Sequence, residues 1–318
     1  MTLTCGVDVG ATKILGGVVD EAGTVVEELL VASPATDVEA IVDAIAGLIT
    51  ELASRHTLEA VGVGAAGYID RARSRVMFAP NLAWRDLDLR GELEERVHLP
   101  VVVENDANAA AWGEFTFGAG KDVDDLLLVT VGTGVGGGVV LDGRLHRGAF
   151  GVGGEIGHLR VVPDGILCGC GNHGCLEAYA SGSALVREAR AAALSKSEGG
   201  TPLAGCLLDR AGGDPAAITG PLITECARAG DPFAIGQLAA LGTGLGEGIA
   251  SLAAVLDPAV VVIGGGVSAA GDLLLDPIRT AFGSQLTGRG HRPLAEIRPA
   301  TLGNRAGLIG AADLARHP

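Results

Sequence analysis

Apolar and polar residues along the chain follow the two periods that mark strands and helices. The segments TCGVDVG (4–10) and ILGGVVD (14–20) lie close together and predict a β-hairpin. The next segment, 37–52, places its large apolar residues on one helical face: Ile41, Ile45, Leu48, Ile49 and Leu52. The runs AVGVGAAG (60–67) and PVVVEND (100–106) end in glycine-rich or polar loops, as buried strands do.

The rest of the chain continues this alternation. Residues 106–115 predict a helix opened by an acidic cap, and 124–143 predict a second hairpin. Helices are expected at 176–192, at 231–256 and at 304–315, and a strand running into a glycine turn at 259–268. The small and polar residues of 195–222 favour a loop or a small insertion. The pattern is that of an α/β protein whose sheets are covered by helices.

Length and composition narrow the classes of protein. The 318 residues suffice for two domains of ordinary size. We find neither an unbroken apolar run of the ~18 residues that a membrane span needs nor a signal peptide, so a cytoplasmic protein is expected. The net charge of -15, without a basic patch, argues against nucleic acid and anionic membranes as partners. With 3% aromatic residues the core must be aliphatic, and 51 glycines indicate tight turns or close backbone approaches.

The two hairpins resemble each other. An ungapped alignment of 9–20 with 131–142 gives identical residues at five positions. The identities could arise by chance, or one glycine-turn hairpin could occur in each of two domains. G-x-G-x-x-G occurs at Gly62/Gly64/Gly67 and at Gly132/Gly134/Gly137, but a dinucleotide fold needs a helix directly after the loop, and the second copy is followed by a strand. The P-loop motif is absent.

Glycine turns of hairpins can still bind phosphate, because successive backbone N–H groups form an anion-binding nest. The first turn adds the Thr12 hydroxyl and the Lys13 ammonium, and the second adds the Thr133 hydroxyl. Asp8 could hold a magnesium ion through water. The alternative is two tight turns without a ligand.

Polar residues at the end of the 100–106 strand are a further candidate. Asn105 and Asp106 lie where ligand sites of α/β proteins collect. The Asp106 carboxylate could serve as a general base toward a hydroxyl, or it could only cap the following helix.

Three of the six cysteines lie within eight residues, in GEIGHLRVVPDGILCGCGNHGCLE (154–177). They are Cys168, Cys170 and Cys175, and His158 precedes them. Structural disulfides are rare in a reducing compartment. The other cysteines are far apart in sequence and are expected to be small buried hydrophobic residues: Cys5, Cys206 and Cys226.

These motifs together resemble the ROK family of sugar kinases, closest to glucokinases of the actinobacterial type. DVGATK (8–13), ENDANAAAWGE (104–114), TVGTGVGGGVV (130–140), GEIGH (154–158) and CGCGNHGCLE (168–177) occur in that family's order and spacing, over essentially the whole chain. One departure is Ala66, where many relatives have proline. The resemblance implies the actin-like, hexokinase-like (ribonuclease H-like) α/β fold, with two domains and an interdomain cleft.

The resemblance also implies the domain boundaries and the functional residues. The small domain would be 1–117 joined by 304–318, and the large domain 118–303 would carry the zinc-binding loop 158–175. Asp106 would be the catalytic base. The sugar would be lined by Asn81, Asn105, Asp106, Glu155, His158 and Glu177, and the nucleotide by Asp8, Gly10, Thr12, Lys13, Gly132, Thr133, Gly134, Gly265 and Gly266. The metal ligands would be His158, Cys168, Cys170 and Cys175.

Three thiolates and one imidazole complete a tetrahedral structural zinc shell. The competing interpretations are a redox pair, although Cys168-Gly-Cys170 lacks the C-x-x-C spacing, or inert thiols. Zinc would take one ring nitrogen of His158, so the other nitrogen would carry the proton and point outward. The loop would thereby hold Glu155 and Glu177 in place as a sugar-binding wall.

The implied reaction is transfer of the γ-phosphoryl group of ATP to the 6-hydroxyl of glucose, with Mg²⁺ and structural Zn²⁺, by a homodimer or homotetramer. The nearer alternative is a kinase for another hexose, N-acetylmannosamine or fructose. The remote alternative is a ROK transcriptional regulator. Regulators carry a DNA-binding segment before the first hairpin, and here seven residues precede Asp8.

Overall fold

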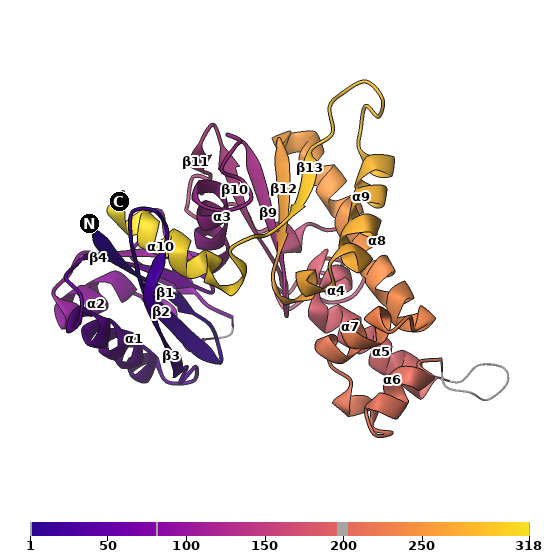
Figure 1. Ribbon diagram of the computed structural model, residues 1–318, viewed down its shortest axis with the longest axis horizontal. Helices are drawn as coiled ribbons and strands as arrows, with labels where there is room; N and C mark the ends of the chain where they lie inside the picture. Colours follow the sequence, from indigo (N-terminus) through magenta and orange to yellow (C-terminus); the bar gives the residue numbers. More distant parts are fainter. Residues whose placement is uncertain (1, 81, 196–202, 318) are drawn as a thin grey trace. The chain divides into compact units, whose positions relative to one another are not determined.

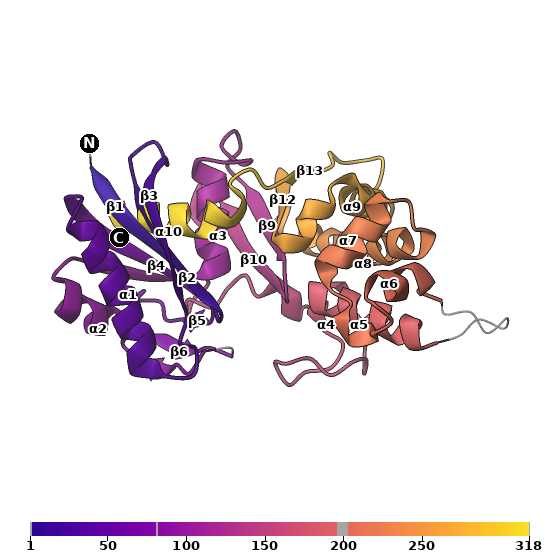
Figure 2. The same cartoon turned by 60° about the horizontal axis from the view of Figure 1, so that its bottom comes forward.

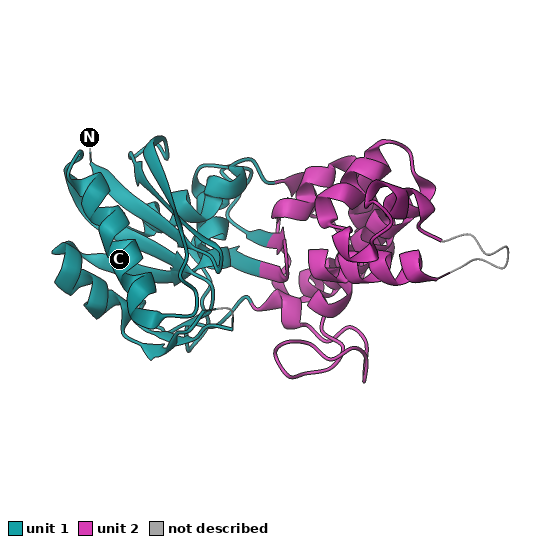
Figure 3. Cartoon of the chain, turned by 90° about the horizontal axis from the view of Figure 1, so that it is seen from below, with its two compact units in different colours: residues 1–128, 137–154, 300–318 teal, residues 129–136, 155–299 magenta. Residues whose placement is uncertain are grey.

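A computed structural model describes residues 2–80, 82–195 and 203–317. The chain forms two compact units, coloured in Figure 3. Unit 1 comprises residues 1–128, 137–154 and 300–318, and unit 2 comprises 129–136 and 155–299. These ranges differ from those of the two domains expected from the sequence. The expected domain boundaries stay a prediction.

Unit 1 contains an open five-stranded sheet in the order β3-β2-β1-β4-β8 (Figure 1). Strands β1 and β2 form the predicted antiparallel hairpin, and β1, β4 and β8 run parallel. Helices α1 and α10 lie on this sheet, and α3 packs against α10. The bounds are β1 (Leu3–Val9), β2 (Lys13–Val19), β3 (Val25–Ala32), β4 (Leu58–Ala65), β8 (Val101–Asn105), α1 (Val38–Ala53), α2 (Leu89–Val97), α3 (Asp106–Thr116) and α10 (Ala306–Arg316).

Alternation along β1 explains how this sheet is covered on both faces. Cys5, Val7 and Val9 are fully buried in one apolar core with the α1 face that the sequence predicted. The intervening Gly6 points the other way, where a side-chain Cβ would overlap the Leu308 carbonyl of α10. Gly62 of β4 has the same relation to α10, since a Cβ there would overlap the Ala311 carbonyl. The helix backbone therefore lies directly on the sheet because these positions lack side chains.

The remaining strands of the described chain form two further sheets. One has three short strands, β5 (Tyr68–Ile69), β6 (Val76–Phe78) and β7 (Arg85–Leu87). The other has the order β11-β10-β9-β12-β13 and contains the second predicted hairpin, β9 and β10. Its bounds are β9 (Leu126–Val131), β10 (Val135–Leu141), β11 (Arg144–Leu145), β12 (Val260–Gly264) and β13 (Glu296–Pro299).

Unit 2 is mostly helical, and α8 lies beside α9 at its centre (Figure 2). Helix α8 is long and apolar enough to cross a membrane, but half of its most apolar window is buried inside the protein, as in the core helix of a soluble protein. The bounds are α4 (Glu177–Ala180), α5 (Gly182–Leu194), α6 (Gly205–Arg210), α7 (Gly220–Arg228), α8 (Pro232–Leu256) and α9 (Asp272–Gln285). Short 3₁₀ helices are η1 (Ile156–His158), η2 (Pro215–Ala217), η3 (Gly266–Ala270) and η4 (Gly303–Arg305).

The structure differs from the expectations at several points. The single helix 176–192 is broken at Ser181, whose side chain caps α5 by accepting from the Ala184 N–H. The segment 195–222, expected to be a loop or a small insertion, is not a plain loop, since its described part contains α6, η2 and the start of α7. Helix α9 and strand β13 were not predicted. Cys206 is exposed, whereas Cys5 and Cys226 are buried as expected.

Candidate functional site

In unit 1, the hairpin turn between β1 and β2 presents the first group of predicted nucleotide-binding residues. The Gly10 N–H donates to the Lys13 carbonyl (3.0 Å), and the Thr12 carbonyl accepts from the Ser33 N–H (3.1 Å), so the backbone of the turn is fixed from both sides. The Thr12 and Lys13 side chains are exposed. Their hydroxyl and ammonium groups are therefore available to a ligand at this turn.

Asp8 lies on β1 just before this turn and is partly buried. The pKa of its carboxyl is raised to about 7, mainly by burial and in addition by the nearby Asp106, while Lys13 acts in the opposite direction. Asp8 and Asp106 thus interact, although they are far apart in sequence. Two neighbouring carboxylates with raised pKa values have the electrostatics of a site that receives a cation or a proton.

Asp106 is the first residue of α3, at the carboxyl end of β8. The helix cap is Asn105, whose Oδ1 accepts from the Asn108 N–H (3.0 Å) and whose Nδ2 donates to the Gly67 carbonyl (3.1 Å). The expectation that an acidic residue caps this helix was therefore wrong, and the Asp106 carboxyl is left for another role. Burial raises its pKa, and hydrogen bonds from the Ala107 and Asp106 backbone and from Asn105 act in the opposite direction.

In unit 2, the turn between β9 and β10 is held by a helix and a carboxylate. The Gly132 N–H donates to the Gly134 carbonyl (3.0 Å), and the Gly182 N–H of α5 donates to the Gly132 carbonyl (2.8 Å). The Val135 N–H donates to Glu177 Oε2 (3.0 Å). The Thr133 side chain is exposed at this turn. A second hairpin turn thus presents a hydroxyl beside backbone N–H groups, as the alignment of the two hairpins predicted.

Gly265 and Gly266 lie where β12 passes into η3. Gly265 has φ +82°, and a Cβ there would lie 2.5 Å from the Val131 carbonyl oxygen. Only glycine fits this position next to β9. The glycine turn of β12 therefore lies beside the strand that leads into the Gly132–Gly134 turn.

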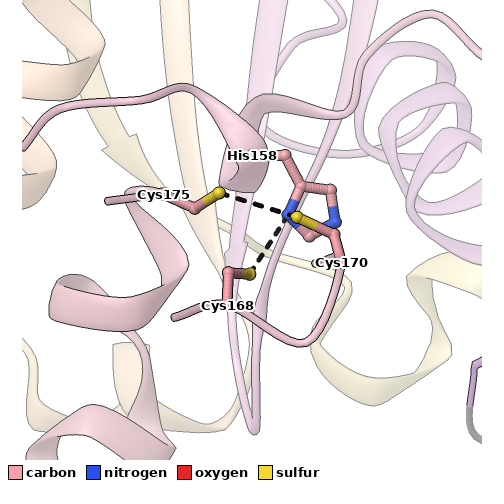
Figure 4. A group of neighbouring side chains, drawn as sticks. All are labelled: His158, Cys168, Cys170 and Cys175. Carbon is pink, nitrogen blue, oxygen red and sulfur yellow. Dashed lines mark hydrogen bonds between the residues drawn. The ribbon is translucent and has the colours of Figure 1, made fainter. Parts of the chain in front are cut away.

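The cysteine cluster of the 154–177 segment also closes in unit 2 (Figure 4). The ligand atoms of His158, Cys168, Cys170 and Cys175 all lie within 4.8 Å of one another. Cys168 Sγ is 3.6 Å from His158 Nδ1, and Cys170 Sγ is 3.7 Å from Cys175 Sγ. A tetrahedral zinc ion with its usual bond lengths needs edges of roughly 3.5–3.8 Å between such atoms. The two distances fit these edges, and the four side chains form a group that could hold a metal ion.

The backbone around the cluster is a small ribbon. Bridges pair Arg160 with Cys175 and Leu167 with His173. Gly174 has φ +79°, and a Cβ at this position would overlap the Val162 carbonyl. The ribbon therefore closes only with glycine there.

The chemistry of the donor set agrees with a metal site. Burial raises the pKa of the Cys168 thiol to about 12, and burial likewise raises the pKa of Cys175. Buried thiolates need a cation at neutral pH. Because His158 Nδ1 faces the sulfur atoms, Nε2 points away from them and lies 3.9 Å from Glu155 Oε2.

Glu177 links this cluster to the glycine turn. Its Oε1 lies 3.7 Å from Cys168 Sγ, while its Oε2 accepts from Val135. The sequence predicted Glu177 beside the cluster but gave no sign of its bond to the β9–β10 turn, which is far away along the chain. Asn81 lies outside the described residues.

Comparison with known proteins gives the class. Residues 4–317 match the ROK family. The glucokinase of Streptomyces coelicolor is 51% identical over 318 residues, covering 100% of this chain and 99% of that protein. The crystal structure of a ROK family glucokinase from Streptomyces griseus in complex with glucose and AMPPNP has a TM-score of 0.90 and 52% identity, covering 99% of this chain and 100% of the other. The xylose repressor of Bacillus subtilis is 30% identical, covering 97% of this chain and 76% of the repressor.

The fold is therefore the mixed α/β, actin-like and hexokinase-like sugar-kinase fold, with open sheets, as the sequence predicted. The chain belongs to the ROK family.

Proposed function

We propose that this protein is an ATP-dependent glucokinase that transfers the γ-phosphoryl group of ATP to the 6-hydroxyl of glucose. The observation that carries the proposal is the similarity to glucokinases along the whole chain, including the glucose- and AMPPNP-bound structure. The arrangement of Asp106 at the end of a parallel strand, beside Asp8 and the first glycine turn, supports it.

Asp106 is the general base of this mechanism. Its carboxylate accepts the proton of the attacking hydroxyl while the phosphoryl group moves in line from ATP to the sugar oxygen. The backbone holds Asp106 without using it as the helix cap, because Asn105 performs that role. A carboxyl with a raised pKa is a stronger base than an ordinary aspartate once it is ionised.

The ATP phosphates are bound by the two hairpin turns. Gly10, Thr12 and Lys13 serve from the first turn, and Gly132, Thr133 and Gly134 from the second, while Gly265 and Gly266 lie along the nucleoside. Asp8 suits a magnesium ion held through water. A magnesium ion bound there would supply positive charge, and Lys13 contributes its ammonium group toward the transferring phosphoryl group, where catalysis of phosphoryl transfer mainly lies.

The sugar hydroxyls are contacted by Asn105, Asp106, Glu155, His158 and Glu177, and by Asn81 outside the described residues. His158, Cys168, Cys170 and Cys175 would hold a structural zinc ion, and their spacing supports this assignment. Zinc bound there would supply a rigid cross-link rather than chemistry. The ring of His158 would then be held with Nε2–H free to donate toward Glu155 or the sugar.

The experiment that tests this function is a coupled kinase assay on the purified protein with a panel of hexoses and donors. Glucose should be turned over with a kcat/KM at least about tenfold above N-acetylmannosamine and fructose, the gap that ~1.4 kcal/mol of differential binding gives. ATP should be preferred over ADP and polyphosphate. Preference for another hexose would refute the glucose assignment, and no phosphorylation of any sugar would refute the kinase assignment.

We further expect a cytoplasmic homodimer or homotetramer. The domain boundaries in the chain are expected at 117–118 and 303–304. Light scattering of the purified protein measures the oligomeric state, and a monomer would contradict it.

A further inference from the structure

The side chain next to the proposed base is a buried carboxylate that the mechanism above does not use. Glu104, on β8, has 1% of its surface exposed. A buried carboxylate destabilises the folded protein unless neighbouring charges and hydrogen bonds compensate it. The charged and hydrogen-bonding groups around Glu104 therefore indicate its structural role.

Two arginines compensate the charge. Arg147 Nε lies 2.7 Å from Glu104 Oε2, and Arg73 Nε lies 3.2 Å from the same oxygen. Both contacts are ion pairs rather than aligned hydrogen bonds, since Oε2 has no hydrogen-bond partner among the described residues. Arg73 reaches Glu104 from a tight turn at φ 55°, and its carbonyl accepts from the Val103 N–H.

The other carboxylate oxygen is bonded to the start of α3. Glu104 Oε1 accepts from the Asn105 N–H (2.9 Å) and from Asn108 Nδ2 (3.2 Å). Asn105 precedes Asp106 directly, and Asn108 donates its own N–H to the Asn105 cap. Glu104 thus binds the Asn105 N–H directly before Asp106 and the Asn108 side chain in the first turn of the helix that carries the Asp106 carboxyl.

Arg147 connects the same carboxylate to another segment. Its two terminal nitrogens donate to the Arg71 carbonyl (3.0 Å) and the Asp70 carbonyl (2.9 Å). The segment 147–154 begins at this arginine and ends at Gly154, where a Cβ would lie 3.5 Å from Asn108 Oδ1. Glu155 and His158 follow directly in the chain.

We propose that Glu104, with Arg147, is a positioning residue that holds the Asp106 base and the segment leading to Glu155 in one fixed arrangement. This inference rests on the proposed function. It concerns geometry for the sugar and not for ATP, because the hydrogen bonds and ion pairs of Glu104 given above involve none of the proposed nucleotide-binding residues.

The test is Glu104→Gln, compared with Glu114→Gln. Glu114 is a second buried carboxylate, 0% exposed, at the other end of α3, where it accepts from the Thr301 and Leu302 N–H groups. Both changes remove a buried charge near α3, but only Glu104 accepts hydrogen bonds from Asn105 and Asn108, which flank Asp106. Steady-state kinetics for glucose and ATP and the melting temperature are measured for both variants and the wild type.

We expect Glu104→Gln to lower kcat about tenfold or more and to raise the glucose KM severalfold, since a misplacement of about 1 Å can cost ~10²-fold. The ATP KM should stay within about twofold. Glu114→Gln should lower only the melting temperature. A Glu104→Gln enzyme that melts earlier but keeps the wild-type kcat and glucose KM overturns the proposal, because Glu104 is then only part of the packing.

Arg147→Lys keeps the proposal testable if Glu104→Gln does not fold. Lysine keeps the charge but cannot reach Glu104 and both carbonyls together. A fall in kcat with unchanged ATP KM supports the proposal, and wild-type kinetics overturn it. Glucose turnover by the wild type, measured in the same assay, tests the proposed function separately from the positioning role.

Discussion

Replacement of Asp106 by asparagine isolates the proton-accepting role of the proposed base. Asparagine keeps the size of the side chain, and the helix start should survive because the cap belongs to Asn105. The amide cannot accept the proton of the sugar hydroxyl at neutral pH. The general-base contribution of ~10²–10⁴-fold should therefore disappear from kcat, which corresponds to about 3–5 kcal/mol in the barrier.

The effect should be confined to the chemical step. Glucose binding should change little, because an amide still offers an acceptor and gains a donor. Removing a partly buried carboxyl with a raised pKa should leave stability unchanged or higher. In the wild type, kcat requires the ionised form, so activity should fall with decreasing pH at values above the ordinary aspartate pKa of ~3.9.

The assay measures ADP release from ATP at saturating glucose between pH 5 and 9, with glucose affinity from calorimetry and melting temperatures as controls. An Asp106→Asn enzyme with more than about a tenth of wild-type turnover would refute the role of Asp106 as the base. A loss of turnover that is matched by loss of folded protein would instead assign the residue to the structure.

The remaining predictions concern the phosphate turn, the metal cluster and Asp8. Thr133→Val should raise the ATP KM or lower kcat in steady-state kinetics while the protein stays folded; unchanged ATP kinetics with a lower melting temperature would make the turn purely structural. Metal analysis should find about one zinc per chain, and Cys175→Ser should weaken its binding and raise the glucose KM far more than it weakens ATP binding by calorimetry; an active, zinc-free enzyme with three titratable thiols in this loop contradicts the site. The pKa of Asp8 is raised to about 7, so between about pH 4 and 7 its carboxyl holds a proton in the folded protein that it lacks in the unfolded chain. The contribution of Asp8 to the free energy of unfolding therefore falls as pH rises through that window, by at most about 4 kcal/mol. In magnesium-free buffer, the melting temperature of the wild type should therefore decline relative to Asp8→Asn from pH 5 to pH 8, and parallel curves would show that Asp8 is not perturbed.

Periodicity predicted the elements whose burial is one-sided. Helix α1 and the strands β1, β2, β4 and β8 follow the expected ranges, because each has a regular apolar face or run. The pattern failed where burial is not regular. In 195–222 small residues serve both loops and short helices, and in 176–192 a single capping serine, Ser181, divides an otherwise helical segment.

Local spacing also indicated that His158, Cys168, Cys170 and Cys175 lie close together, since all four lie in one segment and need only a turn to meet; their role as metal ligands was implied by the resemblance and stays a prediction. Contacts between segments that are distant along the chain could not be predicted from local spacing. One example is the hydrogen bond from Val135 to Glu177, and another is the buried ion pair of Glu104 with Arg147. No repeating sequence pattern relates the residues of either pair. Polar residues in an apolar strand end, as in VVVEND, are a signal that could have singled out Glu104, because a charge at a buried strand position requires a partner.

The glycines show how a distant segment determines the chemistry of the site. Their number alone indicated turns or close approaches without distinguishing them. In the structure, Gly6 and Gly62 leave room for the backbone of α10 on the sheet, and a Cβ on Gly307 of that helix would lie 3.3 Å from the Asp8 carboxyl carbon. The helix therefore covers Asp8, and burial is the main cause of its raised pKa. A larger residue at Gly6 or Gly62 would move α10 away and rehydrate Asp8, so the electrostatics of the proposed magnesium site depend on positions that carry no functional group.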